Sequence, residues 1–439
     1  MLHYIGPELR KGIHKYKYSG EDHSLVSKYV LGPYWNWLIT WFPLWIAPNT
    51  ITLSGLMLVL ANVVSLLWRD WGLDHITATR VQFLSANQGS LPVIPILPNY
   101  GLPIGLDTTK TSSFASVLPP YFFVIWAFSL FMYQSLDSID GKQARRTGMA
   151  GPLGELFDHG CDALNTTLEN FLATTALGMG RSYWSILSLI ASTANFYLST
   201  WEEVHTHSLY LSAFSGPVEG ILMLCGVYLV AGVFGGPTFY LDGVLNLTGL
   251  ANVPYVRDNY AWANWPMSDI LMSFGLVGLI GNALMGYANV YKACMKQKRS
   301  VYQPLLGLLP FVVLTSANFY WMHGNNAQLL KHGSLYVPFM FYWGLSFAYL
   351  VGLVIISHVC QGPFPYWNWM YIPSILGAID ANLSQPILQG SIVSAQWTVY
   401  GAVLLAFLTY GYFVYDVITT ITEETGKPCF TVVPHKHTN

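Results

Sequence analysis

The chain has 439 residues, of which 53% are apolar and 10% are charged, and its mean hydropathy is +0.40. This composition is typical of a membrane protein and excludes an ordinary soluble domain. The formal net charge of −2 offers no basic surface, so nucleic acid is not expected as a partner. The five cysteines are scattered without C-x-x-C spacing, which predicts neither a disulfide framework nor a zinc site.

Residues 1–44 are predicted to be a cytosolic N-terminus that ends at the membrane surface. Arg10 and Lys11 are followed by polar residues rather than by a compact apolar core, so no signal peptide is expected. From Leu25 to Phe42 the sequence is rich in tryptophan and tyrosine, which favour the headgroup depth of a bilayer. This segment is predicted to form an amphipathic interfacial helix.

Residues 45–420 are predicted to form an all-α, polytopic membrane domain with about ten transmembrane helices. A helix needs about 20 apolar residues to cross a hydrocarbon core of ~30 Å. The predicted spans are 45–68, 119–139, 153–178, 183–201, 216–236, 268–292, 303–323, 334–357, 366–384 and 395–420. The ninth is the least regular, because Pro373 and Asp380 interrupt it.

The charge distribution predicts the orientation of this domain. A Pro- and Gly-rich insertion, 69–118, separates the first two spans and carries no motif that indicates a role. Residues 421–439 are predicted to form a tail. When the N-terminus is placed in the cytosol, cytosolic segments hold most of the 20 lysine and arginine residues. The positive-inside rule therefore predicts both termini on the cytosolic side.

Four aspartates flank the turn between the second and third predicted spans: Asp137, Asp140, Asp158 and Asp162. Uncompensated charge at a helix centre costs on the order of 3 kcal/mol per residue, so a functional role is the default reading. Helical spacing places one pair on a single face of its helix and the other pair in a stripe along the next. Facing stripes repel unless divalent cations lie between them, and hard oxygen ligands favour Mg²⁺ or Mn²⁺ over Zn²⁺. The spacing therefore predicts a metal site suited to a substrate with adjacent phosphates.

Small residues lie on the same helix faces: Gly141, Ala144 and Gly154. They leave room for a substrate to approach both backbones. Together with the aspartates they spell D-x-x-D-G-x-x-A-R-x8-G-x-x-x-D-x-x-x-D, which resembles the signature of the CDP-alcohol phosphotransferase family, and within it the eukaryotic choline and ethanolamine phosphotransferases.

The resemblance implies an enzyme of phospholipid synthesis. It implies that the four aspartates bind two metal ions. The implied reaction is the transfer of phosphocholine or phosphoethanolamine from CDP-choline or CDP-ethanolamine to diacylglycerol, which yields phosphatidylcholine or phosphatidylethanolamine and CMP. It also suggests a homodimer. The expected location is the endoplasmic reticulum or another endomembrane such as the Golgi, and the positive-inside rule predicts that the active site faces the cytosol.

The acceptor hydroxyl must lose a proton, and two residues compete as the base. His159 lies beside the metal stripe, and imidazole titrates near neutrality. The same Asp-His-Gly-Cys-Asp run in the eukaryotic relatives implies that His159 is the base. Asp162 is the alternative, although bound metal ions would hold its oxygens and lower its basicity. His159 as a packing or hydrogen-bonding residue is the third interpretation.

Three further residues are candidates for the nucleotide side of the site. Arg145 and Lys142 both lie close enough to Asp140 to bind a phosphate, and guanidinium geometry favours Arg145. Asn49 follows Pro48 at the start of the first span, where it either caps the helix or, as the resemblance implies, contacts the cytidine or ribose.

Two acidic positions are candidates for recognising a cationic headgroup, Glu203 and Glu219. Both lie in stretches that resemble the choline and ethanolamine phosphotransferases. Glu203, with its neighbour Glu202, could equally form a solvated helix end. A different class of protein, a transporter or cation channel that uses the aspartates as its ion site, is disfavoured because the cluster lies at one edge of the membrane and no broken-helix pair is evident.

Overall fold

The computed structural model describes residues 3–16, 19–22, 24–86, 118–211 and 216–433, and it is mostly helical, as predicted. The longer helices are α3 (Pro48–Arg69), α4 (Asp74–Ala86), α6 (Tyr121–Thr147), α7 (Pro152–Ala176), α8 (Tyr183–Thr206), α9 (Pro217–Val233), α13 (Met267–Gln297), α15 (Leu309–Lys331), α16 (Gly333–Val359), α17 (Tyr371–Ala381) and α18 (Ile392–Thr425). The shorter ones are α1 (Pro7–Ile13), η1 (Ser27–Leu31), α2 (Gly32–Leu38), η2 (Ile39–Trp41), α10 (Thr238–Leu241), α11 (Val244–Leu247), η3 (Leu250–Asn252), α12 (Pro254–Tyr260), η4 (Ala261–Ala263) and α14 (Tyr302–Leu306).

The described residues include a pair of short strands that was not predicted from the sequence. Strands β1 (Gly20–Asp22) and β2 (Leu209–Leu211) pair in parallel, with Gly20 opposite Leu209. This pair joins the N-terminal segment to the chain that follows α8. Strands of three residues carry no periodicity that a sequence reading can detect.

Among the described residues, 6 helices are long and apolar enough to cross a membrane, so the chain is an integral membrane protein. They are α3, α6, α13, the stretch Tyr302–Gly324, α16 and α18. Helices α9 and α17 are apolar but shorter, and α7 and α8 carry acidic residues within their length. The ninth predicted span, 366–384, contains only the 11-residue helix α17, because the residues before Tyr371 are extended or turned.

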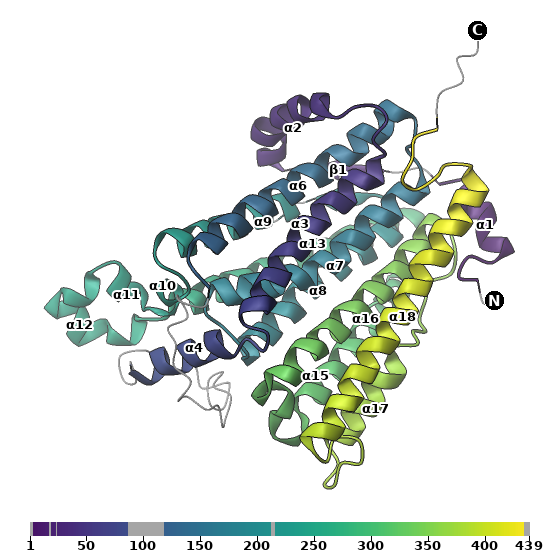
Figure 1. Cartoon of the computed structure of the whole chain (residues 1–439). Helices are drawn as coiled ribbons and strands as arrows, with labels where there is room; N and C mark the ends of the chain where they lie inside the picture. Colours follow the sequence, from purple (N-terminus) through teal and green to yellow (C-terminus); the bar gives the residue numbers. More distant parts are fainter. Residues whose placement is uncertain (1–2, 17–18, 23, 87–117, 212–215, 434–439) are drawn as a thin grey trace.

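The helices form two groups that lie side by side (Figure 1). Helices α3 to α13 make up one group and α15 to α18 the other, and α16 packs against α7 and α8 at the boundary. The most apolar window of α16 is 83% buried, whereas that of α13 is 6% buried. The centre of the core therefore lies along α16, and α13 lies on the outside.

The predicted interfacial segment is helical from Ser27 to Trp41, as η1, α2 and η2. Its Trp35 is buried, whereas Trp37 and Trp41 are exposed at the surface of the molecule. Side chains at the end of α6 hold the segment: Lys142 Nζ donates to Asn36 Oδ1 over 2.9 Å, and Arg146 donates to the carbonyls of Ile39 and Phe42. Lys142 is therefore directed to this segment. The location of the segment at a membrane surface stays a prediction.

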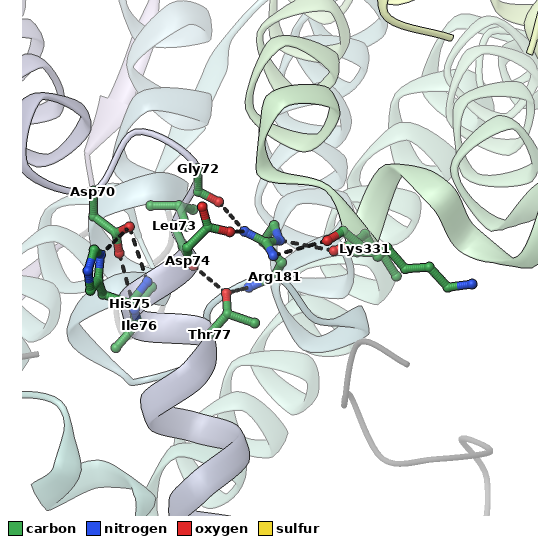
Figure 2. A network of polar contacts seen from close by, with 10 residues as sticks. Asp70, Gly72, Leu73, Asp74, His75, Ile76, Thr77, Arg181 and Lys331 are labelled. Carbon is green, nitrogen blue, oxygen red and sulfur yellow. Dashed lines mark hydrogen bonds and ion pairs between the residues drawn. The ribbon is translucent and has the colours of Figure 1, made fainter. Parts of the chain in front are cut away.

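The opposite end of α3 and α7 is closed by a polar network around the buried side chain of Arg181 (Figure 2). Its guanidinium donates to the carbonyls of Gly72, Leu330 and Lys331 and to the carboxylate of Asp74. The carboxylate of Asp70 accepts from the backbone N–H of His75 at 3.2 Å and of Ile76 at 3.1 Å, so it caps α4. Helix α4 lies inside the predicted 69–118 insertion, of which residues 87–117 lie outside the described residues.

Candidate metal and nucleotide site

The aspartate motif lies on two consecutive helices joined by a tight turn. Helix α6 continues to Thr147, beyond the predicted end of the second span, so the first half of the motif is entirely helical. Gly148 ends α6 in the left-handed region, with φ 69°, a conformation that glycine adopts without strain. Pro152 then occupies the first turn of α7, where its fixed φ suits a helix start. The turn brings the two acidic stripes together.

Three of the four aspartates form a tight cluster. Asp137, Asp158 and Asp162 each offer a carboxylate oxygen, and these atoms lie within 4.8 Å of one another. The Oδ1 atoms of Asp137 and Asp158 are buried and accept no hydrogen bond from the described part of the chain. Asp162 accepts a hydrogen bond from the hydroxyl of Tyr133. Buried carboxylates this close repel, so a set of hard oxygen ligands with unsatisfied atoms fits a divalent cation.

Asp140, the fourth predicted ligand, lies beside this cluster rather than in it. Its carboxylate accepts a hydrogen bond from the hydroxyl of Thr52, near the start of α3. Its charge still acts on Asp137 and on Asp158. The structure thus brings a third helix to the motif through Thr52. Sequence reasoning did not single out Thr52 or Tyr133, although Tyr133 is one helical turn before Asp137.

A second acidic cluster adjoins His159, which is partly buried on α7. Glu155, one helical turn before His159, joins Glu203 from α8 and His358 from α16, with ligand atoms within 4.8 Å of one another. Both carboxylate oxygens of Glu155 are buried and have no hydrogen-bond partner among the described residues. Glu155 and His358 were not predicted. The i, i+4 spacing of Glu155 and His159 is the sequence signal that would have found the former.

The alternative that Glu202 and Glu203 form a solvated helix end is wrong. Glu202 is 7% exposed and Glu203 is 4% exposed, because α13 and α16 pack against this end of α8. Glu202 Oε1 accepts from Asn289 Nδ2 over 2.7 Å. Glu219, the other headgroup candidate, lies apart from both clusters, in the first turn of α9, where it accepts from the hydroxyl of Ser24.

Of the nucleotide-side candidates, Asn49 borders a small cavity. Asn49 and Gly154 line it together with the α6–α7 turn and the residues that follow α18. A side chain added at Gly154 would meet no heavy atom within 4 Å, so the space in front of this glycine is open. The helix-cap interpretation of Asn49 is wrong, because Ala47 is the N-cap of α3 and the buried Asn49 amide instead donates to Cys429 Sγ over 3.3 Å.

The other small positions lie on the same face of α6. Gly141 and Ala144 are partly exposed, and Arg145 is exposed. An added Cβ at Gly141 would lie 3.8 Å from Arg145 Nη1, so the guanidinium lies beside the residue that follows Asp140. Arg145 and Gly141 therefore share one face of α6.

These features describe an integral membrane protein with a carboxylate site where α3, α6 and α7 meet, and the comparisons with known proteins agree. A model of the family described as CDP-alcohol phosphatidyltransferase matches residues 109–251. An uncharacterized CDP-alcohol phosphatidyltransferase class-I family protein of Schizosaccharomyces pombe is 36% identical over 423 residues, which cover 96% of each chain.

Two relatives from Saccharomyces cerevisiae carry functional names. Cholinephosphotransferase 1 is 32% identical over 424 residues, 93% of this chain and 92% of the relative. Choline/ethanolaminephosphotransferase 1 is 34% identical over 378 residues, 84% of this chain and 82% of the relative. The chain belongs to the CDP-alcohol phosphatidyltransferase family. It is therefore a transferase of phosphate groups in the synthesis of phospholipids from CDP-alcohols.

Proposed function

We propose that the protein transfers phosphocholine or phosphoethanolamine from CDP-choline or CDP-ethanolamine to diacylglycerol, and releases CMP. The observation that carries this proposal is the cluster of Asp137, Asp158 and Asp162 with its unsatisfied buried oxygens, in a chain whose named relatives are choline and ethanolamine phosphotransferases. A lipid acceptor and a soluble nucleotide meet most simply at the end of a membrane bundle, which is where this cluster lies.

The proposed cofactor is a pair of Mg²⁺ or Mn²⁺ ions, held by Asp137, Asp140, Asp158 and Asp162. When bound, the ions neutralise the diphosphate and stabilise the oxygen that leaves with CMP. Thr52 and Tyr133 orient two of the ligating carboxylates by donating to Asp140 and Asp162. Arg145, beside Gly141, binds a phosphate of the nucleotide.

In this proposal His159 accepts the proton of the diacylglycerol hydroxyl. Asp162 is less suited because it is a metal ligand and already accepts a hydrogen bond from Tyr133. Glu155, one helical turn before His159 on the same face, has no hydrogen-bond partner among the described residues, and its negative charge would stabilise the protonated imidazole. Glu203, in contact range of Glu155, contributes negative charge for a cationic headgroup.

The proposed topology has ten spans, in which α7, α8, α9 and the ninth span, 366–384, made of α17 and the extended chain that flanks it, cross with the 6 apolar helices. Helices with buried acidic residues are tolerated in a membrane where those residues face the bundle interior. The active site then faces the cytosol of the endoplasmic reticulum or another endomembrane, and the homodimer implied by the family stays a prediction.

One assay tests the function. The purified full-length protein, reconstituted with diacylglycerol and Mg²⁺, should release CMP from CDP-choline, CDP-ethanolamine or both, and form the matching phospholipid. Omission of diacylglycerol should stop the reaction, which separates transfer from hydrolysis. A protein that binds divalent cations and carries them across vesicles, but forms no phospholipid from either CDP-alcohol, would instead support the transporter or channel interpretation.

A further inference from the structure

The chain beyond α18 turns back over the candidate nucleotide site. Gly426 follows the last residue of α18 with φ 66°, in the left-handed region, and its N–H donates to Thr422 O over 2.9 Å. This cap reverses the chain toward the start of α3 and α7 (Figure 1). We call residues Lys427–Phe430 the C-terminal strap. The family match ends at residue 251, so the strap lies outside it.

The strap contacts the α6–α7 turn, α3 and α7. Lys427 Nζ donates to Ala150 O in the α6–α7 turn over 2.7 Å. The Cys429 thiol accepts from the Asn49 amide over 3.3 Å, and the Phe430 ring meets the edge of Phe157 with centroids 5.5 Å apart. A bond to sulfur and a lysine contact at the surface are each weak, so the main free-energy cost of displacing the strap is the exposure of the buried Cys429.

With the strap in this position, the cavity beside Asn49 is too small to hold a nucleotide. The cavity bordered by Asn49, Gly154 and the strap measures about 70 Å³. Pockets for ligands of nucleotide size measure roughly 300–1,000 Å³. The other walls are the first turns of α3 and α7 and the turn before α7, which are fixed by helix packing.

Space for the strap exists on its other side. A second cavity of about 590 Å³ lies between Phe430–Val432 and the chain from Phe42 to Ser54. Phe430 itself is 47% exposed. An outward shift of the strap into this cavity would merge the two spaces without moving a transmembrane helix.

We propose that the C-terminal strap controls nucleotide access. The Cys429 thiol accepts the hydrogen bond of the Asn49 amide until a CDP-alcohol displaces the strap and accepts that hydrogen bond instead. This inference rests on the proposed function, in which Asn49 and Gly154 border the nucleotide. It assigns Cys429 as a residue that competes with the nucleotide for Asn49, and not as a catalytic residue.

The reactivity of Cys429 tests the displacement. The full-length protein is treated with N-ethylmaleimide, with and without CDP-choline and Mg²⁺, and alkylation of each cysteine is followed by peptide mass spectrometry. Cys429 should react slowly alone, since it is 7% exposed, and at least about fivefold faster with the nucleotide. Cys225 and Cys360, also buried, are internal controls whose rates should not change.

Bound CDP-choline is measured in the same samples by equilibrium dialysis, which separates the two proposals. If CDP-choline binds and the Cys429 rate is unchanged or lower, the strap inference fails while the proposed function stands. If no CDP-choline binds at saturating Mg²⁺, the proposed function fails and the strap inference fails with it.

A substitution gives an independent readout. Cys429→Ala leaves the buried Asn49 amide without its acceptor until the nucleotide arrives, so the apparent KM for CDP-choline should fall by about three- to tenfold at constant kcat. Cys429→Ser restores an acceptor and should return KM to the wild-type value. Cys225→Ala, a buried cysteine on α9, is the matched control. An unchanged or increased KM in Cys429→Ala would contradict the proposal that Cys429 competes with the nucleotide for Asn49.

Discussion

Asp158 is the residue whose surroundings most directly require a cation. One of its oxygens is buried without a donor among the described residues, and the oxygens of Asp137 and Asp162 lie within 4.8 Å. Removing one of several repelling carboxylates need not destabilise the protein without metal. The charge of Asp158 therefore lowers the stability of the folded protein, and a bound cation would offset this loss.

Asp158→Asn should therefore abolish transfer, to below about 5% of the wild-type rate at saturating Mg²⁺, while thermal stability in detergent is unchanged or higher. Asp258→Asn, an exposed carboxylate on α12, is the control and should retain full activity. Chelation by EDTA should stop the wild-type reaction, and added Mg²⁺ or Mn²⁺ should restore it. Substantial turnover in Asp158→Asn would remove the two-metal proposal.

The proposed role of His159 as the general base can be distinguished from the role of a metal ligand. His159→Ala should lower kcat by roughly 10²–10⁴, the usual contribution of a positioned general base, with little change in CDP-choline affinity. Asp162→Asn should instead weaken Mg²⁺-dependent nucleotide binding together with the rate. Measuring kcat and nucleotide affinity in both variants decides the assignment. If His159→Ala is fully active, Asp162 or a metal-bound hydroxyl is left as the route for the proton.

For single residues, the sequence predicted the aspartate cluster but not the side chains from other helices that lie beside it. Helical spacing was sufficient for Asp137, Asp158 and Asp162, because a regular helix fixes which side chains share a face. Thr52 and His358 come from helices distant in sequence, and only tertiary packing places them there. Glu155 was within reach of the same spacing argument and was overlooked.

Among the elements, the start of α7 carries the clearest steric prediction. Gly154→Leu should abolish CDP-choline binding, because the side chain would fill the cavity between Asn49 and the α6–α7 turn. Calorimetry on the purified variant measures this. Gly411→Leu is the control: it lies on α18, also has no heavy atom within 4 Å of an added Cβ, and borders no part of the site. Wild-type affinity in Gly154→Leu would show that the nucleotide binds elsewhere.

The helices themselves were largely predictable, since runs of apolar residues near the length of a membrane crossing are strong signals. Two boundaries differ for physical reasons. Helix α6 extends to Thr147 because polar residues continue a helix beyond an apolar stretch when the packing of α3 supports them. Helix α17 is shorter than predicted, because tryptophan and proline before Tyr371 are apolar without being helical.

In the molecule as a whole, the two ends of α3 and α7 differ in how completely their buried polar groups are hydrogen-bonded. One end holds unsatisfied carboxylates and a small cavity, and the other is closed by Arg181, each of whose guanidinium nitrogens donates a hydrogen bond. No composition argument predicts the second end, because a single arginine in a turn gives no pattern.

Arg181→Met should lower thermal stability in detergent and leave the KM for CDP-choline in the surviving protein unchanged. The carbonyls of Gly72, Leu330 and Lys331 lose their donor, which costs about 1–3 kcal/mol for each group left buried. Arg181→Lys should be intermediate, since an ammonium cannot span all of these acceptors. Arg257→Met, at an exposed position on α12, should have no effect. A wild-type melting temperature in Arg181→Met would contradict this account.

The acceptors of Arg181 also bear on how the chain is assembled. Leu330 and Lys331 are the last residues of α15, where the helix dipole is negative and the final carbonyls lack partners within the helix. The charge that satisfies them comes from the turn between α7 and α8, and Asp74 at the start of α4 contributes the balancing carboxylate. During synthesis the arginine emerges about 150 residues before these carbonyls. Gly72 and Asp74 are made before the arginine and can accept from it at once, whereas its bonds to Leu330 and Lys331 form only after α15 is made. The second group of helices therefore completes a network that the first group has begun.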